Sequence, residues 1–164
     1  MLEVLKDFYS RVYRDERLAP FFHGVTMQRA IEKQYSFLRD LFAGTRDYFG
    51  DRPRNAHHWM VISEELFDHR EALMEACLRR YGLAEDLIRE WRAAEEVFRR
   101  QIVKDRPIPR RVQGVDLPLD GYSSAVLSSG GLCDVCEAEI PVGGSATYHV
   151  RTGKTYCVRC SPDA

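Results

Sequence analysis

The sequence lacks long apolar runs and an excess of charge of either sign. Its longest apolar stretches fall far below the roughly 20 residues that a membrane-spanning helix needs. Its 24 basic and 25 acidic residues leave a net charge of −1, without the basic stretches that bind nucleic acid. Met1 leads directly into a patterned helix, with no signal sequence. We therefore expect a cytoplasmic protein that contacts no membrane and for which nucleic acid is an unlikely partner.

Cysteine is scarce outside one short region. Cys77 lies alone in an apolar helical pattern, where we expect a buried, unreactive thiol. The remaining cysteines form two Cys-x-x-Cys pairs near the C-terminus, which indicate a metal site more than a disulfide framework. An enzyme built on a cysteine nucleophile is disfavoured, because Cys77 lacks the electropositive setting that activates a thiol.

Apolar residues recur at helical spacing through the first 105 residues, which predicts an all-α domain over residues 1–105. Thr26 and Gly44 are the expected start and stop signals of one of its helices. The segment 44–55 holds two glycines and a proline and should be irregular. Proline, glycine and serine in residues 106–131 indicate a linker, followed by a small module over 132–164. The expected helices span about residues 2–12, 26–44, 61–81 and 84–103.

Three polar residues stand where the helical pattern requires apolar ones: Tyr9, Gln34 and Arg70. A buried amide without a partner costs about 1–3 kcal/mol, so each needs a use. Each could bond a backbone carbonyl, and Arg70 could extend to water. Together they suggest a polar pocket inside an apolar core. The stretch "NAHHWMVISEELFDH" adds two candidate ligands, His57 and His58, and the neighbouring residues do not choose between them.

A family resemblance chooses between them. The residues from Leu5 to Ile102 resemble the truncated haemoglobins, shortened globins in which two helices pack on two. The residues that carry this resemblance are the pairs Phe8-Tyr9, Phe21-Phe22 and Lys33-Gln34, then Tyr48, and a histidine shortly before an Ile-Ser pair, which is His57 before Ile62-Ser63.

The resemblance implies a haem b iron held by His57, with the opposite axial position free for O2, NO or CO. It implies that Tyr9 and Gln34 are donors to the bound ligand, that Phe22 wedges the porphyrin and that Lys33 pairs with a propionate. His58 is then expected to lie behind His57 or to face solvent. The other residues that the resemblance places around the haem are Ala30, Leu38, Tyr48, Ile62, Phe67 and Arg70.

Two positions depart from the family pattern. Ala30 stands at the family's distal gate, where its small side chain leaves the path open for ligand or solvent. Arg70 stands where some branches place a tryptophan over the ligand. An inward arginine would favour anionic or superoxide-like ligands, whereas an outward one would have no effect.

The C-terminal cysteines predict a zinc ribbon. Two Cys-x-x-Cys pairs, separated by 20 residues, present four thiolates in the geometry of structural zinc. A rubredoxin-like iron site and a redox dithiol are the alternatives. The spacer reads as a β-hairpin of residues 146–150 and 155–157, in which His149 is an ordinary strand residue. So small a segment needs its metal to fold. The expected zinc ligands are Cys133, Cys136, Cys157 and Cys160.

Two hypotheses for function follow. The first is a haem protein that binds a diatomic gas for transport, sensing or NO detoxification, the last by an activity of the NO dioxygenase type with a reductase as partner. Its ribbon would then dock a protein partner. The second is a haem-free globin-like module that acts through its zinc ribbon as an adaptor for protein or nucleic acid. His57, Tyr9, Gln34 and the paired phenylalanines favour the first.

Overall fold

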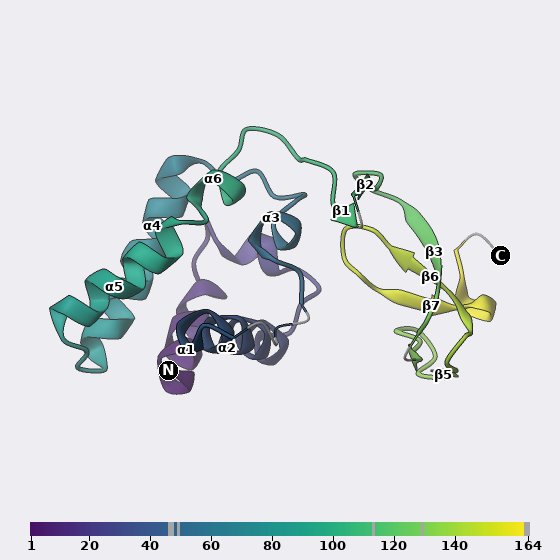
Figure 1. Cartoon of the computed structure of the whole chain (residues 1–164), viewed down its shortest axis with the longest axis horizontal. Coiled ribbons are helices and arrows are strands. Elements are labelled where there is room, and N and C mark those ends of the chain that lie inside the picture. Colours follow the sequence, from purple (N-terminus) through teal and green to yellow (C-terminus); the bar gives the residue numbers. More distant parts are fainter. Residues whose placement is uncertain (46–47, 49, 113, 129, 163–164) are drawn as a thin grey trace. The chain divides into compact units, whose positions relative to one another are not determined.

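The computed structural model describes residues 1–45, 48, 50–112, 114–128 and 130–162. The chain divides into two compact units, Met1–Pro107 and Ile108–Ala164 (Figure 1), and each is described by itself. Among the described residues, no helix combines the length and apolar character needed to cross a membrane.

The first unit is helical throughout, as predicted. Helix α1 packs against α2, α4 packs against α5, and α1 also contacts α4, so two helical pairs form the sandwich (Figure 1). The short helices α3 and α6 contact each other. The elements are α1 (Leu2–Val12), a 3-10 turn (Ala19–Phe22), α2 (Met27–Ala43), α3 (Pro53–Ala56), α4 (Glu64–Arg80), α5 (Glu85–Glu96) and α6 (Arg99–Ile102).

The long helices begin and end at residues with a local reason to do so. The Thr26 hydroxyl accepts a hydrogen bond from the Arg29 N–H at 3.3 Å, and the Ser63 hydroxyl accepts one from the Leu66 N–H at 3.1 Å. Gly44 ends α2 in a left-handed conformation with φ of 64°, which glycine adopts without strain. The third expected helix therefore starts at Glu64, later than predicted, because Ser63 is its cap.

The fourth expected helix is interrupted. Helix α5 ends at Glu96 and α6 begins at Arg99, so the predicted continuous helix over 84–103 is wrong in its middle. After the turn, the Lys104 N–H donates to the Ile62 carbonyl at 2.9 Å. The turn places α6 beside α3, which precedes His57.

The core of the first unit lies between the two helical pairs. Cys77, at 0% exposure, confirms the predicted buried thiol. The largest fully buried apolar side chains are Leu5, Phe8, Val12, Leu38, Met74, Leu78 and Ile88.

The second unit is built from short antiparallel strands (Figure 1). Its three-stranded sheet has β6 in the centre, between β3 and β7, and the β6–β7 hairpin matches the predicted one. The interior is small: Cys133, Ile140 and Ala146 form its buried cluster. The strands are β1 (Arg111–Val112), β2 (Val115–Asp116), β3 (Tyr122–Val126), β4 (Gly131–Leu132), β5 (Glu139–Ile140), β6 (Ser145–His149) and β7 (Thr155–Cys157), with a final 3-10 turn (Val158–Cys160).

Strand β3 lies inside the segment that we expected to be a linker. It pairs with β6 in register, Ser124 opposite Thr147, and so joins the ribbon sheet. Its sequence, YSSAV, lacks the alternation of apolar and polar residues that marks a strand. The predicted boundaries of the helical domain (1–105), the linker (106–131) and the small module (132–164) stay a prediction.

Candidate functional site

Tyr9 of α1 and Gln34 of α2 meet in the first unit. The buried Tyr9 hydroxyl donates a hydrogen bond to Gln34 Oε1 at 2.5 Å. Phe8 and Phe22 pack edge-on against the Tyr9 ring, with centroids 5.2 and 5.7 Å away. Burial raises the pKa of Tyr9, so the phenol keeps its proton. Because that proton is used on the Gln34 oxygen, the Gln34 NH2 is the donor left for a ligand.

His57 follows directly after α3, whose first residue is Pro53. The His57 Nδ1 lies 2.8 Å from the Pro53 carbonyl oxygen, so Nδ1 carries the proton and Nε2 carries the lone pair. Burial lowers the pKa of His57 to about 4, and the charges of Lys104 and Arg70 act in the same direction. The half-buried imidazole is therefore neutral near pH 7, the form that ligates a metal.

The second histidine, His58, is buried with 2% of its surface exposed. The alternative in which His58 faces solvent is therefore wrong, and a position behind His57 stays a prediction.

Arg70 of α4 turns toward two buried acidic residues, and its entry into the distal pocket stays a prediction. Its Nη1 lies 2.5 Å from Glu71 Oε1 and 2.8 Å from Glu95 Oε1, and its guanidinium lies 4.9 Å from the centroid of the Phe8 ring. Burial is the largest influence on both groups and raises the pKa of Tyr9 but lowers that of His57; the positive charge of Arg70 acts to lower both pKa values. The guanidinium is thus within electrostatic reach of both sides of the candidate site.

Two buried acids that were not predicted from the sequence hold Arg70. Glu71 and Glu95 are 1% and 8% exposed, and the Glu71 Oε2 also lies 3.0 Å from the Arg92 Nε. The signal was present: Glu71 falls at helical spacing between Phe67 and Met74, inside the apolar stripe of α4. It is the same signal that singled out Arg70.

Four of the other predicted pocket residues form two groups: two pack on neighbouring aromatic rings, and two lie near α6. Phe22 packs against Tyr9, and Tyr48 packs against Phe37 with ring centroids 5.3 Å apart. Phe67 lies under the Arg99 guanidinium, and Ile62 bridges to Lys104, so both lie near α6. Lys33 is exposed, and Ala30, Leu38, Ile62 and Phe67 are buried.

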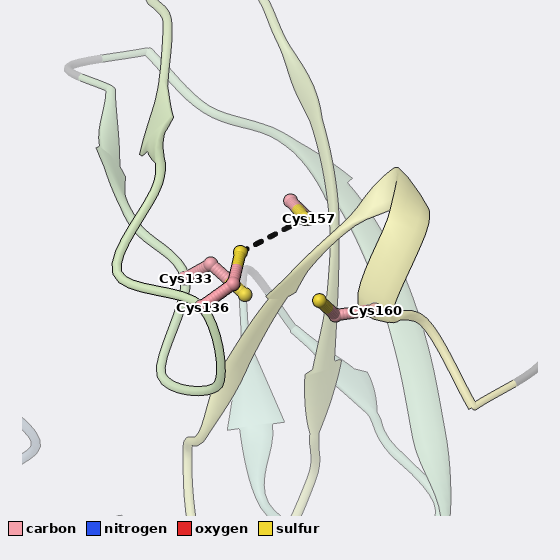
Figure 2. A group of neighbouring side chains, drawn as sticks. All are labelled: Cys133, Cys136, Cys157 and Cys160. Carbon is pink, nitrogen blue, oxygen red and sulfur yellow. Dashed lines mark hydrogen bonds between the residues drawn. The ribbon is translucent and has the colours of Figure 1, made fainter.

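The four ribbon cysteines converge on one point (Figure 2). Cys133 and Cys136 come from the loop after β4, Cys157 from the end of β7 and Cys160 from the final 3-10 turn. The ligand atoms all lie within 4.8 Å of one another, and the Cys136 and Cys157 sulfurs are 3.8 Å apart. Backbone N–H groups of Cys136 and Cys157 lower the pKa of Cys133 to about 6, which favours a thiolate.

Zinc fits this donor set. Four sulfurs at the usual Zn–S distance of about 2.3 Å form a tetrahedron with edges of about 3.8 Å, the separation found between Cys136 and Cys157. The small buried cluster of this unit also agrees with a fold that depends on a metal.

Known proteins resemble the first unit in sequence and in structure. The family model described as "Bacterial-like globin" matches residues 1–103. The "Group 1 truncated hemoglobin GlbN" of Synechocystis sp. is 39% identical over 87 residues, which are 51% of this chain and 70% of that protein. The "Group 1 truncated hemoglobin" of Tetrahymena thermophila is 29% identical over 83 residues, 51% of this chain and 69% of that protein.

Solved structures agree. The truncated hemoglobin of Tetrahymena pyriformis in the Fe(III) form has a TM-score of 0.58 at 27% identity, covering 62% of this chain and 87% of that one. The 2/2 hemoglobin of Synechococcus sp., in the cyanomet state with covalently attached heme, has a TM-score of 0.58 at 25% identity, covering 62% and 88%.

Variants of the Tetrahymena pyriformis protein also match in spacing. One replaces a tyrosine and another a glutamine 25 positions later, which is the separation of Tyr9 and Gln34. A third replaces a glutamine four positions before the second one, and four positions before Gln34 this chain has Ala30. With the family model covering more than half of the chain, the protein belongs to the bacterial-like globins, and its first unit is a truncated haemoglobin domain.

Proposed function

We propose that the first unit binds haem b through His57 Nε2 and holds a diatomic ligand, O2, NO or CO, on the opposite side near Tyr9 and Gln34. The observation that carries this proposal is the state of His57. Its Nδ1 is tied to the Pro53 carbonyl, its imidazole is neutral, and Nε2 takes part in no hydrogen bond with the described residues. A ligand histidine in a metal site is oriented by a hydrogen bond of this kind on its other nitrogen.

The relatives support the same cofactor. The Tetrahymena pyriformis structures contain iron in the Fe(III) form, and the Synechococcus structure contains attached heme. When bound, haem supplies an iron with one open coordination position for the gas. The chain would supply the surroundings: we assign Phe22, Ala30, Leu38, Tyr48, Ile62 and Phe67 to contacts with the porphyrin, and Lys33 to a propionate.

On the ligand side, Tyr9 and Gln34 act as a pair. The Tyr9 hydroxyl holds the Gln34 oxygen, which turns the Gln34 NH2 toward the ligand. Loss of the Tyr9 hydroxyl would leave this amide free to rotate. Ala30 offers no polar atom at the position where the spacing of the Tetrahymena variants places a second glutamine, so this pocket would have one donor fewer. Binding is the function these residues support, and oxidation of NO to nitrate would in addition need a reductase as electron source.

We further propose that the second unit binds structural zinc through its four cysteines and serves as a protein-interaction module. Leu132, Val135 and Val158 flank the cysteines in sequence and are 64%, 62% and 68% exposed. Apolar side chains around the site, with no excess of positive charge, favour a protein partner over nucleic acid.

The test is ligand binding by the full chain, purified with zinc and reconstituted with haem. We expect one haem per chain, a Soret band and CO binding to the reduced protein. Tyr9→Phe should speed O2 dissociation about 10-fold, the equivalent of one hydrogen bond of about 1.4 kcal/mol. Tyr13→Phe is the matched control, because the Tyr13 hydroxyl donates to the Val25 carbonyl and not to Gln34. Equal O2 dissociation rates in the two variants would contradict the assigned role of Tyr9, and absence of a Soret band would favour the haem-free adaptor.

A further inference from the structure

Arg70 has donors that its two acidic partners do not use. The ion pairs with Glu71 and Glu95 both end on Nη1, at 2.5 and 2.8 Å. Within the described ranges, Nη2 and Nε of Arg70 donate no hydrogen bond to the protein. The side chain nevertheless keeps 22% of its surface exposed. One edge of the guanidinium is therefore anchored, and the other is available to a ligand.

The Arg70 guanidinium lies near the residues that we assign to the ligand side of the proposed haem site. The Arg70 guanidinium lies over the Phe8 ring at 4.9 Å, and the Phe8 ring meets the Tyr9 ring at 5.2 Å. The charge of Arg70 acts on Tyr9 and also on His57, the residues on either side of the proposed haem.

The position of Arg70 is set by an ionic cluster between α4 and α5. Glu71 is 1% exposed and bridges Arg70 to the Arg92 Nε at 3.0 Å. Glu95 of α5 holds Arg70 from the other helix. Burial raises the pKa of Glu95, while the neighbouring Arg70 acts to lower it. Arg92 also pairs with Glu75 at 2.8 Å, so each arginine has an acidic partner besides Glu71.

We propose that Arg70 makes this pocket selective for small monovalent anions as ligands of ferric haem, with its Nη2 and Nε edge donating to the anion. This inference rests on the proposed binding of haem at His57. Arginine suits the role, since its charge is permanent and its planar fork directs several donors to one ligand. Hydrogen bonds between ionised groups are about twice as strong as neutral ones, which gives the anion its advantage over a neutral ligand. Glu71 and Glu95 act as positioning residues.

The test compares azide, a small monovalent anion, with neutral imidazole as ligands of the ferric, haem-loaded full chain. Arg70→Met should weaken azide binding about 10- to 100-fold, the range for hydrogen bonds to charged groups. Imidazole affinity should change less than about twofold, because it gains nothing from the charge. Arg92→Met is the matched control: it removes the other arginine bound to Glu71 and should leave the ratio of the two affinities unchanged.

An unchanged azide-to-imidazole ratio in an Arg70→Met protein that keeps the wild-type Soret band would overturn the proposal. Arg70→Lys provides a second variant should Arg70→Met not hold haem, and it should keep part of the azide preference but lose the fork. A wild-type ratio in Arg70→Lys would show that the guanidinium edge has no role. Failure of the unmodified chain to bind haem is a separate outcome, which refutes the proposed function itself.

Discussion

Glu71→Gln should destabilise the first unit far more than a similar change at the surface. Glu71 is 1% exposed, and its two oxygens lie 2.5 and 3.0 Å from Arg70 and Arg92. Removing one partner of a buried ion pair costs about 3–5 kcal/mol, because a buried charge is left without compensation. Glutamine keeps the side-chain volume and part of the hydrogen bonding, so we expect about 3 kcal/mol.

The matched control is Glu64→Gln on the same helix. Glu64 also pairs with an arginine, Arg99 at 2.6 Å, but its side chain is 68% exposed. Exposed pairs of this kind contribute about 0–1 kcal/mol. The two variants therefore differ in burial while sharing the helix, the residue type and the class of partner.

Urea unfolding of the zinc-loaded chain, without added haem, measures the effect. The chain has two tryptophans, Trp59 and Trp91, and both lie in the first unit, so their fluorescence reports that unit alone. With a slope of about 1–3 kcal/mol per molar urea, a loss of 3 kcal/mol lowers the midpoint by roughly 1–3 M. A shift for Glu71→Gln no larger than that of Glu64→Gln would refute the idea that the ionic cluster stabilises the fold and positions Arg70.

Three further predictions concern other parts of the chain. Removal of zinc by a chelator, or Cys136→Ser, should unfold the second unit, seen as loss of β-sheet circular dichroism and of bound zinc, with the tryptophan fluorescence of the first unit unchanged. For Asp15, burial acts to raise the pKa, but hydrogen bonds from His69 and from two backbone N–H groups outweigh it and leave the pKa below its ordinary value. The carboxylate therefore stabilises the fold above about pH 4, and this contribution is lost as pH falls through the lowered pKa. Asp15→Asn should then reduce stability at pH 7 and flatten its decline below pH 4, which thermal unfolding across pH measures. Ser63→Ala should cost about 1 kcal/mol of unfolding free energy, since it removes the cap of α4, while Ser36→Ala in mid-helix should cost less.

Periodicity predicted the long helices because each buries one apolar stripe. It could not predict α3, since four residues form a single turn with no repeat, nor the turn at Val97, because the apolar spacing continues through it. Strand β3 was missed because its place depends on pairing with β6 more than on its own composition.

The candidate site shows the same division. Tyr9, Gln34 and Arg70 stood out as polar residues in apolar stripes, and the structure joins Tyr9 to Gln34 directly. The direction of Arg70 depended on Glu95, 25 positions further along the chain, and no local pattern reports such a contact. The orientation of His57 by the Pro53 carbonyl likewise needed the geometry of α3.

The most direct test of the central claim is the visible spectrum of the haem-reconstituted protein beside its His57→Ala and His58→Ala variants. The neutral imidazole of His57, oriented by Pro53, predicts a strong Soret band that is lost or shifted in His57→Ala and kept in His58→Ala. Loss of the band in His58→Ala alone, or no haem uptake in any of the three proteins, would contradict the assignment of His57 as the iron ligand.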